Sequence, residues 1–245
     1  MALKGRLTRS RIPGADEMPK SLASFGGHGV VVLLPEDSEA HSRARSTMEK
    51  GATLFSPELE LCTTWPPHVT IAAGPWLDEA AARQCAEHVA RQIAPFNVTL
   101  GPRVEVEEDE GEHRAAAYSA DQTLRAGWVE ATTPQALTAD GTDQCTNEFM
   151  RLHGVAMTFL NKELHKFEPH SSLHYFASGE CSVAQKAVMY DSLKATWETP
   201  VSFLAPGLHV TQYLGRTPDE WKAIAFFPFE ARENSGELVF QRRHV

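Results

Sequence analysis

The spacing of apolar residues between positions 28 and 48 predicts a strand followed by a helix. An apolar, β-branched run extends from His28 to Pro35, which is typical of a buried strand. Ser38 can cap a helix directly after it, because a serine hydroxyl accepts a hydrogen bond from a backbone N–H of the first turn. Apolar residues then recur at the four-residue spacing of one helix face, at Ala40, Ala44 and Met48.

The same two spacings continue along the rest of the chain. Apolar runs and alternations predict strands that start near Pro67 and near Pro169, and strands over 96–106, 114–119, 201–215 and 223–229. We expect the strand over 201–215 to bend at Pro206-Gly207. Helix caps stand at Asp78, Thr142 and Ser182. The buried stripes of the first two of these helices are expected at Ala81, Cys85 and Val89, and at Cys145, Phe149, Leu152, Ala156 and Phe159.

The predicted order of elements, β-α-β-α-β-β-α-β-α-β-β, has a weak internal symmetry. Helix–strand units stand on both sides of a central hairpin, which predicts two lobes that face each other across a cleft. We assign residues 25–245 to one bilobal domain. Residues 1–24 are expected to form a disordered or loosely packed tail, because Gly5, Pro13 and Gly14 break any long amphipathic helix there.

Composition and charge narrow the classes of partner. The net charge of −9 disfavours binding along a nucleic-acid backbone but allows a small anionic ligand held by local donors. No run approaches the ~20 apolar residues of a membrane span, so we expect no membrane contact. The four cysteines, Cys62, Cys85, Cys145 and Cys181, form neither a C-x-x-C nor a zinc pattern. We therefore expect reduced cysteines in a cytoplasmic monomer.

Two tripeptides carry the candidate chemistry, His68-Val69-Thr70 and His170-Ser171-Ser172. Each follows a proline, and each opens a short apolar run. Because alternate side chains of a strand point to the same face, each histidine shares a face with the hydroxyl two residues later. Two imidazoles and two hydroxyls can supply a general base, a general acid and two phosphate hydrogen-bond donors. We expect the two strands to be central in their lobes and the two rings to face each other across the cleft.

A third match, His209-Val210-Thr211, shows that a single H-x-[ST] tripeptide is a weak signal. A half-buried strand histidine bonded to backbone explains any one of them equally well. His209 has no preceding proline and no predicted helix after its strand, so we predict a structural role for it. Thr211 and Tyr213 share its face, and their strand could still line the cleft.

The segments Pro67-His68-Val69-Thr70-Ile71 and Pro169-His170-Ser171-Ser172-Leu173-His174-Tyr175 resemble the two-histidine (2H) phosphoesterases, and among them the eukaryotic cyclic phosphodiesterases. The resemblance implies an α+β fold with two antiparallel sheets that face a central cleft and helices on the outside. It also implies metal-free hydrolysis of a cyclic phosphate. By resemblance to the plant-type enzymes, His170 would be the base and His68 the acid.

Three neighbours of the second motif have open roles. The resemblance places Tyr175 in the site, whereas strand alternation places it on the face opposite His170. Both hold only if the strand bulges or ends after Leu173. On a regular strand His174 would share the face of His170, and Glu168 could orient His170 or be a surface charge.

The favoured function is a cyclic phosphodiesterase that opens a 2′,3′- or 1″,2″-cyclic phosphate of a nucleoside or of ADP-ribose. His68 and His170 would be catalytic, Thr70, Ser172 and Tyr175 would bind the substrate, and no metal or cofactor is expected. One alternative is an RNA 3′-end phosphodiesterase or ligase of the same superfamily, which the acidic charge disfavours. Another is a nucleotide-binding module without turnover, although both histidines and both hydroxyls are intact. A structural protein with chance motifs would leave the paired Pro-His contexts unexplained.

Overall fold

The computed structural model describes residues 27–55, 65–106, 124–133, 148–164, 167–177, 182–213 and 221–230. The predicted tail over 1–24, the predicted strand over 114–119, the cap at Thr142 and three of the four cysteines lie outside these ranges. Cys85 is described, and it is buried and unpaired as predicted. Among the helices of these ranges, none has the length and apolar character needed to cross a membrane.

The described chain alternates strands and helices, which confirms the α+β class. The elements are β1 (His28–Leu33), α1 (Glu39–Phe55), β2 (His68–Gly74), α2 (Glu79–Ala90), β3 (Phe96–Val106), β4 (Leu124–Thr132), α3 (Glu148–Phe159), β5 (His170–Ala177), α4 (Val183–Trp197), β6 (Val201–Ala205), β7 (Gly207–Tyr213) and β8 (Trp221–Pro228). Two predicted caps are confirmed. Asp78 accepts a hydrogen bond from the backbone N–H of Ala81, and Ser182 forms a capping box with Gln185.

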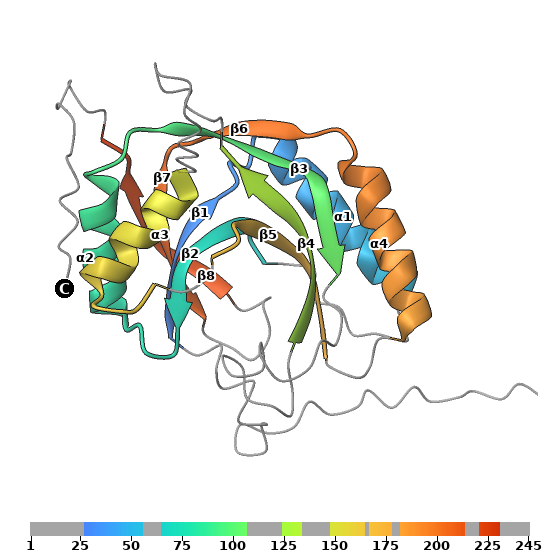
Figure 1. Ribbon diagram of the computed structural model, residues 1–245, viewed down its shortest axis with the longest axis horizontal. Helices are drawn as coiled ribbons and strands as arrows, with labels where there is room; N and C mark the ends of the chain where they lie inside the picture. The colour runs from blue at the N-terminus through green and yellow to red at the C-terminus, as the bar shows by residue number, and fades with distance from the viewer. Residues whose placement is uncertain are drawn as a thin grey trace, which may run out of the picture.

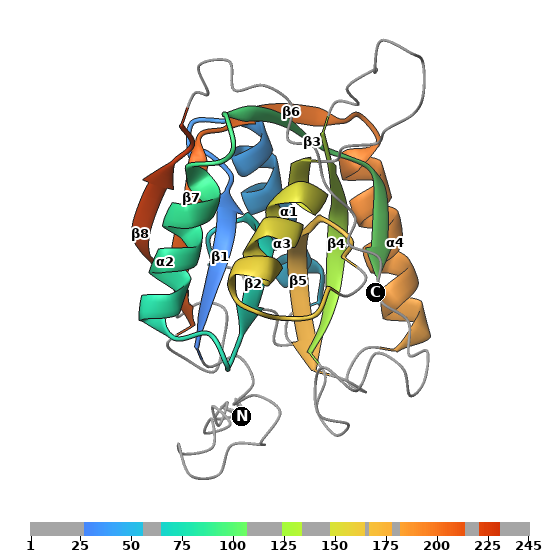
Figure 2. The same ribbon diagram turned by 60° about the vertical axis from the view of Figure 1, so that its left-hand side comes forward.

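The described strands form one antiparallel sheet of eight strands, whereas the resemblance implied two sheets. Its order is β6-β3-β4-β5-β2-β1-β7-β8. Two four-stranded halves join where β2 pairs with β5, and the partners at this junction are Val69 and Ser171. Figure 2 shows β1, β2, β5 and β4 side by side. The predicted lobes are therefore the two halves of a single curled sheet.

The helices pack in two pairs, and each pair covers one half of the sheet. Helices α2 and α3 lie against β1, β2 and β7, whereas α1 and α4 lie against β3 to β6 (Figure 1). Helix α1 follows β1 in the chain but packs on β5 and β6 of the other half. Helix α3 precedes β5 but packs on β2. Each half of the chain thus contributes a helix to the opposite half of the sheet.

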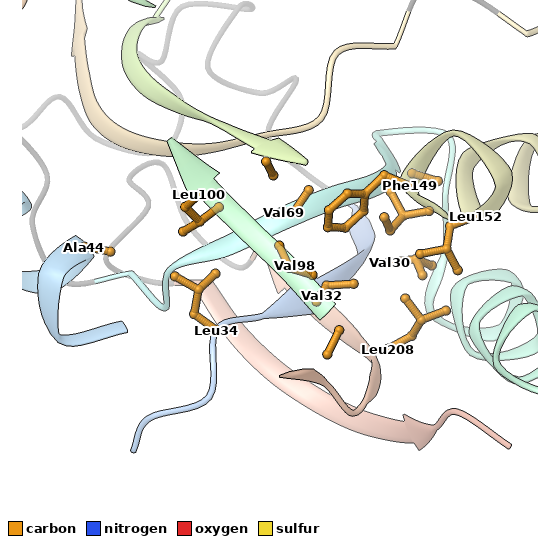
Figure 3. Packing of buried hydrophobic residues seen from close by; sticks show 14 of the residues in the cluster. Val30, Val32, Leu34, Ala44, Val69, Val98, Leu100, Phe149, Leu152 and Leu208 are labelled. Carbon is orange, nitrogen blue, oxygen red and sulfur yellow. The ribbon is translucent and has the colours of Figure 1, made fainter. Parts of the chain in front are cut away.

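One hydrophobic core connects the halves (Figure 3). It includes Val30 and Val32 from β1, Val98 from β3 and Phe149 from α3. The predicted stripe of α1 is confirmed, with Ala40, Ala44 and Met48 fully buried. Of the predicted stripe of α3, Phe149, Leu152 and Ala156 are buried, Phe159 is not, and Cys145 lies outside the described residues.

Phe159 is the exception, because it is 38% exposed. It lies in the last turn of α3, where its ring stacks on the exposed ring of His88 at 4.7 Å, outside the core.

The predicted strand over 201–215 divides at Pro206, where a bend was expected. Its first part, β6, pairs with β3 in one half of the sheet, and its second part, β7, pairs with β1 in the other half. Proline has no N–H to donate to a strand partner, and the Pro206 carbonyl accepts a hydrogen bond from Phe229 at 2.9 Å. The segment 201–213 therefore forms a second covalent link between the two halves of the sheet, separate from the β2–β5 junction.

Strand β5 carries one extra residue next to its second serine. Ser172 pairs with position 128 of β4, and His174 pairs with position 127, so Leu173 is the inserted residue of a β-bulge. The insertion reverses the alternation of faces, and His174 is buried against Gly51 of α1. His174 was expected to share the face of His170 only on a regular strand, and the bulge shows that this condition is not met.

Replacing Gly51 by alanine should destabilise the protein, although alanine is the better helix former. A methyl group at position 51 would lie 2.2 Å from Cε1 of the His174 ring. Overpacking of a core costs about 1–3 kcal/mol, which outweighs the gain of about 0.5–1 kcal/mol for alanine over glycine in a helix. Urea unfolding should therefore show a lower free energy of unfolding for Gly51→Ala.

The matched control is Gly154→Ala in α3, where no atom lies within 4 Å of the added methyl. This variant should be more stable than the parent by about 0.5–1 kcal/mol. Equal stabilisation by both substitutions would show that His174 does not pack on Gly51.

Candidate active site

The junction of β2 and β5 places four polar side chains on one face of the sheet. Val69 and Ser171, which pair there, are fully buried. Their neighbours along each strand point to the opposite face, and these neighbours are His68, Thr70, His170 and Ser172. The sequence predicted two rings facing each other across a cleft, but the structure sets them side by side on adjoining strands.

The antiparallel register determines how these four side chains are arranged. With Val69 opposite Ser171, the register sets His68 beside Ser172 and Thr70 beside His170. Side chains directly opposite in such a pair have Cβ atoms about 4.5–5.5 Å apart, and diagonal ones about 7–8 Å. The two imidazoles therefore occupy one diagonal of a square, and the two hydroxyls occupy the other diagonal. His68 is buried at this square, whereas the other three side chains are half-buried.

Both histidines make the same backbone contact. Nδ1 of His68 lies 2.7 Å from the carbonyl oxygen of Pro66, and Nδ1 of His170 lies 2.7 Å from that of Glu168. A carbonyl oxygen only accepts hydrogen bonds, so each Nδ1 carries the hydrogen and donates it. Each Nε2 is then the nitrogen that can take up or deliver a proton. The backbone carbonyl of Glu168 thus orients His170, whereas the sequence left its side chain as either an orienting group or a surface charge.

The proline before each histidine accounts for this shared geometry. Pro67 and Pro169 stand between the accepting carbonyl and the histidine. Proline fixes its own φ near −65° and restricts the residue before it to extended conformations. The carbonyl two residues before the ring is therefore held in one orientation. This explains why the proline matters to the motif.

The environment of His68 favours its neutral form. Burial lowers the pKa of His68 to about 4, the hydrogen bond to Pro66 opposes this shift, and the charge of nearby His170 lowers the pKa further. The Trp221 ring lies 5.8 Å from the His68 ring. Trp65 lies 6.5 Å from Trp221. These large, buried aromatic rings keep water away from the imidazole, so it is uncharged near neutral pH.

The bulge of β5 meets a condition that was set for a site role of Tyr175. A site role for Tyr175 required the strand to bulge or end after Leu173, and the register shifts between Ser172 and His174. The Tyr175 side chain itself lies outside the described residues, so its contact with a substrate stays a prediction.

His209 lies on the same face as the four polar side chains, but its position and its contacts differ from those of His68 and His170. Val31 pairs with Thr70 on one side and with His209 on the other, so β1 separates His209 from the junction. Its ring packs on Phe226 at 4.6 Å, and burial lowers its pKa to about 4. Among the described residues, its Nδ1 has no hydrogen-bond partner. The third H-x-[ST] tripeptide therefore lacks the carbonyl anchor that the other two share.

One polar neighbour of His170 was missed from the sequence. Glu130 of β4 pairs directly with His170, and its carboxylate lies 3.8 Å from the Arg103 guanidinium. The predicted strand of this region was placed over 114–119, so β4 was not expected. The alternation of buried Val129 and Ala131 with Glu130 was the available signal.

The described side chains form no cluster suited to a metal ion. Across the ranges that the structure describes, no three histidine, cysteine, aspartate or glutamate side chains gather closely enough to hold one. The groups at the β2–β5 junction are suited to moving protons and to donating hydrogen bonds to anionic oxygens.

Comparison with known proteins gives similarity of structure alone. No family model matches the chain, and no curated protein matches its sequence. A solved structure of TT0787 from Thermus thermophilus is 16% identical, with a TM-score of 0.47 over 82% of this chain and 97% of that chain. Kluyveromyces marxianus Usb1 is 10% identical, with a TM-score of 0.41 over 84% of this chain and 99% of that one.

A second structure of the Kluyveromyces protein, with uridine monophosphate, is 11% identical, with a TM-score of 0.43 over 86% of this chain and 100% of that chain. At these identities and TM-scores, the likenesses assign neither a family nor a substrate to this chain.

Nitrogen-15 NMR of the histidine rings should show both His68 and His170 in the Nδ1–H tautomer. The reason is that both Nδ1 atoms donate to carbonyl oxygens. The His68 signals should stay those of a neutral ring until the pH approaches its pKa of about 4. The substitutions His68→Gln and His170→Gln assign the two sets of signals. An Nε2–H tautomer at either ring, or protonation of His68 near its ordinary pKa of about 6.5, would contradict this geometry.

Proposed function

We propose that this protein is a phosphodiesterase that hydrolyses a cyclic phosphate by acid–base catalysis between His68 and His170. The substrate class is a nucleoside 2′,3′-cyclic phosphate or an ADP-ribose 1″,2″-cyclic phosphate, opened to a phosphomonoester. The observation that supports this most strongly is the square at the β2–β5 junction. Two imidazoles, each with its Nδ1 committed to a carbonyl, lie on one diagonal, and two hydroxyls lie on the other.

The square suits in-line displacement at phosphorus. A phosphate above its centre has one imidazole on each side, so one ring can activate the attacking water while the other faces the leaving oxygen. The base takes a proton from water, the new P–O bond forms, the ring P–O bond breaks, and the acid protonates the departing alkoxide. The hydroxyls of Thr70 and Ser172 then donate to the non-bridging oxygens, where negative charge builds.

The proposal also covers a substrate contact, the absence of a metal and the size of the ligand. Tyr175 is proposed to contact the substrate, because the bulge at Leu173 has the position that this role requires. Metal-independent turnover is proposed because the imidazole pair can supply both proton transfers. The net charge of −9 favours a small ligand over a long nucleic-acid track, and the protein is proposed to act as a monomer.

A panel of cyclic phosphates in excess chelator tests this function. The parent protein should convert at least one of them to a monoester. His68→Ala and His170→Ala should each lower kcat by about 10²–10⁴-fold, the typical cost of losing one general acid or base. Thr70→Ala and Ser172→Ala should each cost less. The control His209→Ala should stay within a few-fold of the parent, because this ring lacks the carbonyl anchor. Circular dichroism establishes that each variant is folded.

Other outcomes would favour the alternatives. Binding of a nucleotide without turnover would indicate a binding module. Turnover lost with chelator and restored by a divalent ion would indicate metal-dependent chemistry. A loss in His209→Ala as large as in His170→Ala would show that the wrong pair of histidines was chosen.

A further inference from the structure

Glu130 is the residue of β4 that lies directly beside His170. The β4–β5 register pairs them, so both side chains point to the face that carries Thr70 and Ser172, with Cβ atoms about 4.5–5.5 Å apart. The Glu130 side chain is 32% exposed. Glu130 therefore stands next to the square described above, on the side of His170 that is remote from β2.

The charges around His170 are predominantly negative. The charged groups described near it are Glu130 of β4, which pairs with it, Glu168 just before β5, and, beyond β4, Arg103 and Glu105 of β3. From β2 it faces Thr70 and the His68 ring. The hydrogen bond of Arg103 to Glu105, with the charges of Glu130 and Glu168, raises the pKa of the guanidinium. One cation thus stands among three carboxylates, so the local charge favours an imidazolium at His170.

His68 has the opposite environment. Its neighbour on β1 is Leu33, its neighbour on β5 is Ser172 by the register, and the Trp221 ring lies 5.8 Å away. None of these neighbours carries a charge. The two histidines are therefore equivalent in their backbone anchors but differ in the electrostatics of their surroundings, and such a difference separates an acid from a base.

We propose that Glu130 is a positioning residue that keeps His170 protonated, so that His170 is the general acid of the proposed reaction and His68 is the base. This inference rests on the proposed function. Arg103 lies on β3, on the other side of β4 from His170, and its guanidinium is 3.8 Å from the Glu130 carboxylate. The assignment is the reverse of the one that the resemblance to the plant-type enzymes implies.

The proton movements balance over one turnover. Nε2 of neutral His68 takes a proton from water as the oxygen attacks phosphorus. The bond from phosphorus to the ring oxygen breaks, and Nε2 of the His170 imidazolium protonates the leaving alkoxide. His68 then loses its proton to solvent, and His170 regains one from solvent with Glu130 beside it. No other reactant is needed.

Glu130→Gln tests the charge relation, because glutamine keeps the shape and removes the charge. Without the carboxylate the imidazolium is less favoured, so the NMR titration midpoint of His170 in the substrate-free protein should fall by about half to one pH unit. The alkaline limb of the kcat/KM profile, where the acid loses its proton, should move to lower pH by the same amount. Below the midpoint, the rate should stay near that of the parent.

The matched control is Glu87→Gln on α2, which also removes a carboxylate paired with an arginine, Arg91, but is not beside the site. It should leave both the midpoint and the limb unchanged. A second test uses a substrate with an activated leaving group, which needs little protonation. On it, His170→Ala should recover most of its lost rate, whereas His68→Ala should not.

The possible outcomes distinguish a failure of the role proposed for Glu130 from a failure of the proposed function. A His170 midpoint that does not move in Glu130→Gln, or rescue of His68→Ala in place of His170→Ala, overturns the inference even if cyclic phosphate is hydrolysed. A parent protein that turns over no cyclic phosphate refutes the proposed function and, with it, the acid role. The substrate-free titration is independent of turnover and still decides whether Glu130 acts on His170.

Discussion

The pairing of Val69 with Ser171 is the contact on which the rest of the structure depends. Within the described chain it pairs β2 with β5, and it thereby joins two four-stranded halves into one sheet. Because both partners are fully buried, the residues on either side of them must point the other way. A shift of one residue in this register would send the histidines into the core and the buried residues to the surface. The crossed packing of α1 and α3 on opposite halves supports the junction from behind.

Two similar anchors and two dissimilar environments characterise the candidate site. The same proline-directed carbonyl contact orients both rings and makes Nε2 the nitrogen of each that can take up or deliver a proton. The surroundings then distinguish them, because His68 lies among apolar rings while His170 pairs with an acidic residue, Glu130, on the neighbouring strand. We propose that the repeated anchor forms the site and that the difference in nearby charge assigns the acid and base roles. His209 has the tripeptide but not the anchor, which shows that the motif alone is insufficient.

Local signals were sufficient for most elements and for the motifs. The stripe of Ala40, Ala44 and Met48 and the caps at Asp78 and Ser182 depend on residues within a turn or two of each other, so the sequence predicted them correctly. The single sheet and the pairing of Glu130 with His170 depend on strands that are far apart in the chain. Periodicity carries no information on such partners. The bulge at Leu173 is of the same kind: the conflict over Tyr175 pointed to it, but only the β4 partner shows where the extra residue lies.

His68 and His170 are proposed to serve one phosphate together, and a titration with a phosphomonoester, the class of product proposed, tests this most directly. A nucleoside 2′-monophosphate would be added to protein labelled with nitrogen-15 in its histidines. The Nε2 signals of both rings should shift along one binding curve with a single Kd, while those of His88, exposed on α2, should not move. A monophosphate that binds while either His68 or His170 keeps its unliganded signals would contradict a shared site.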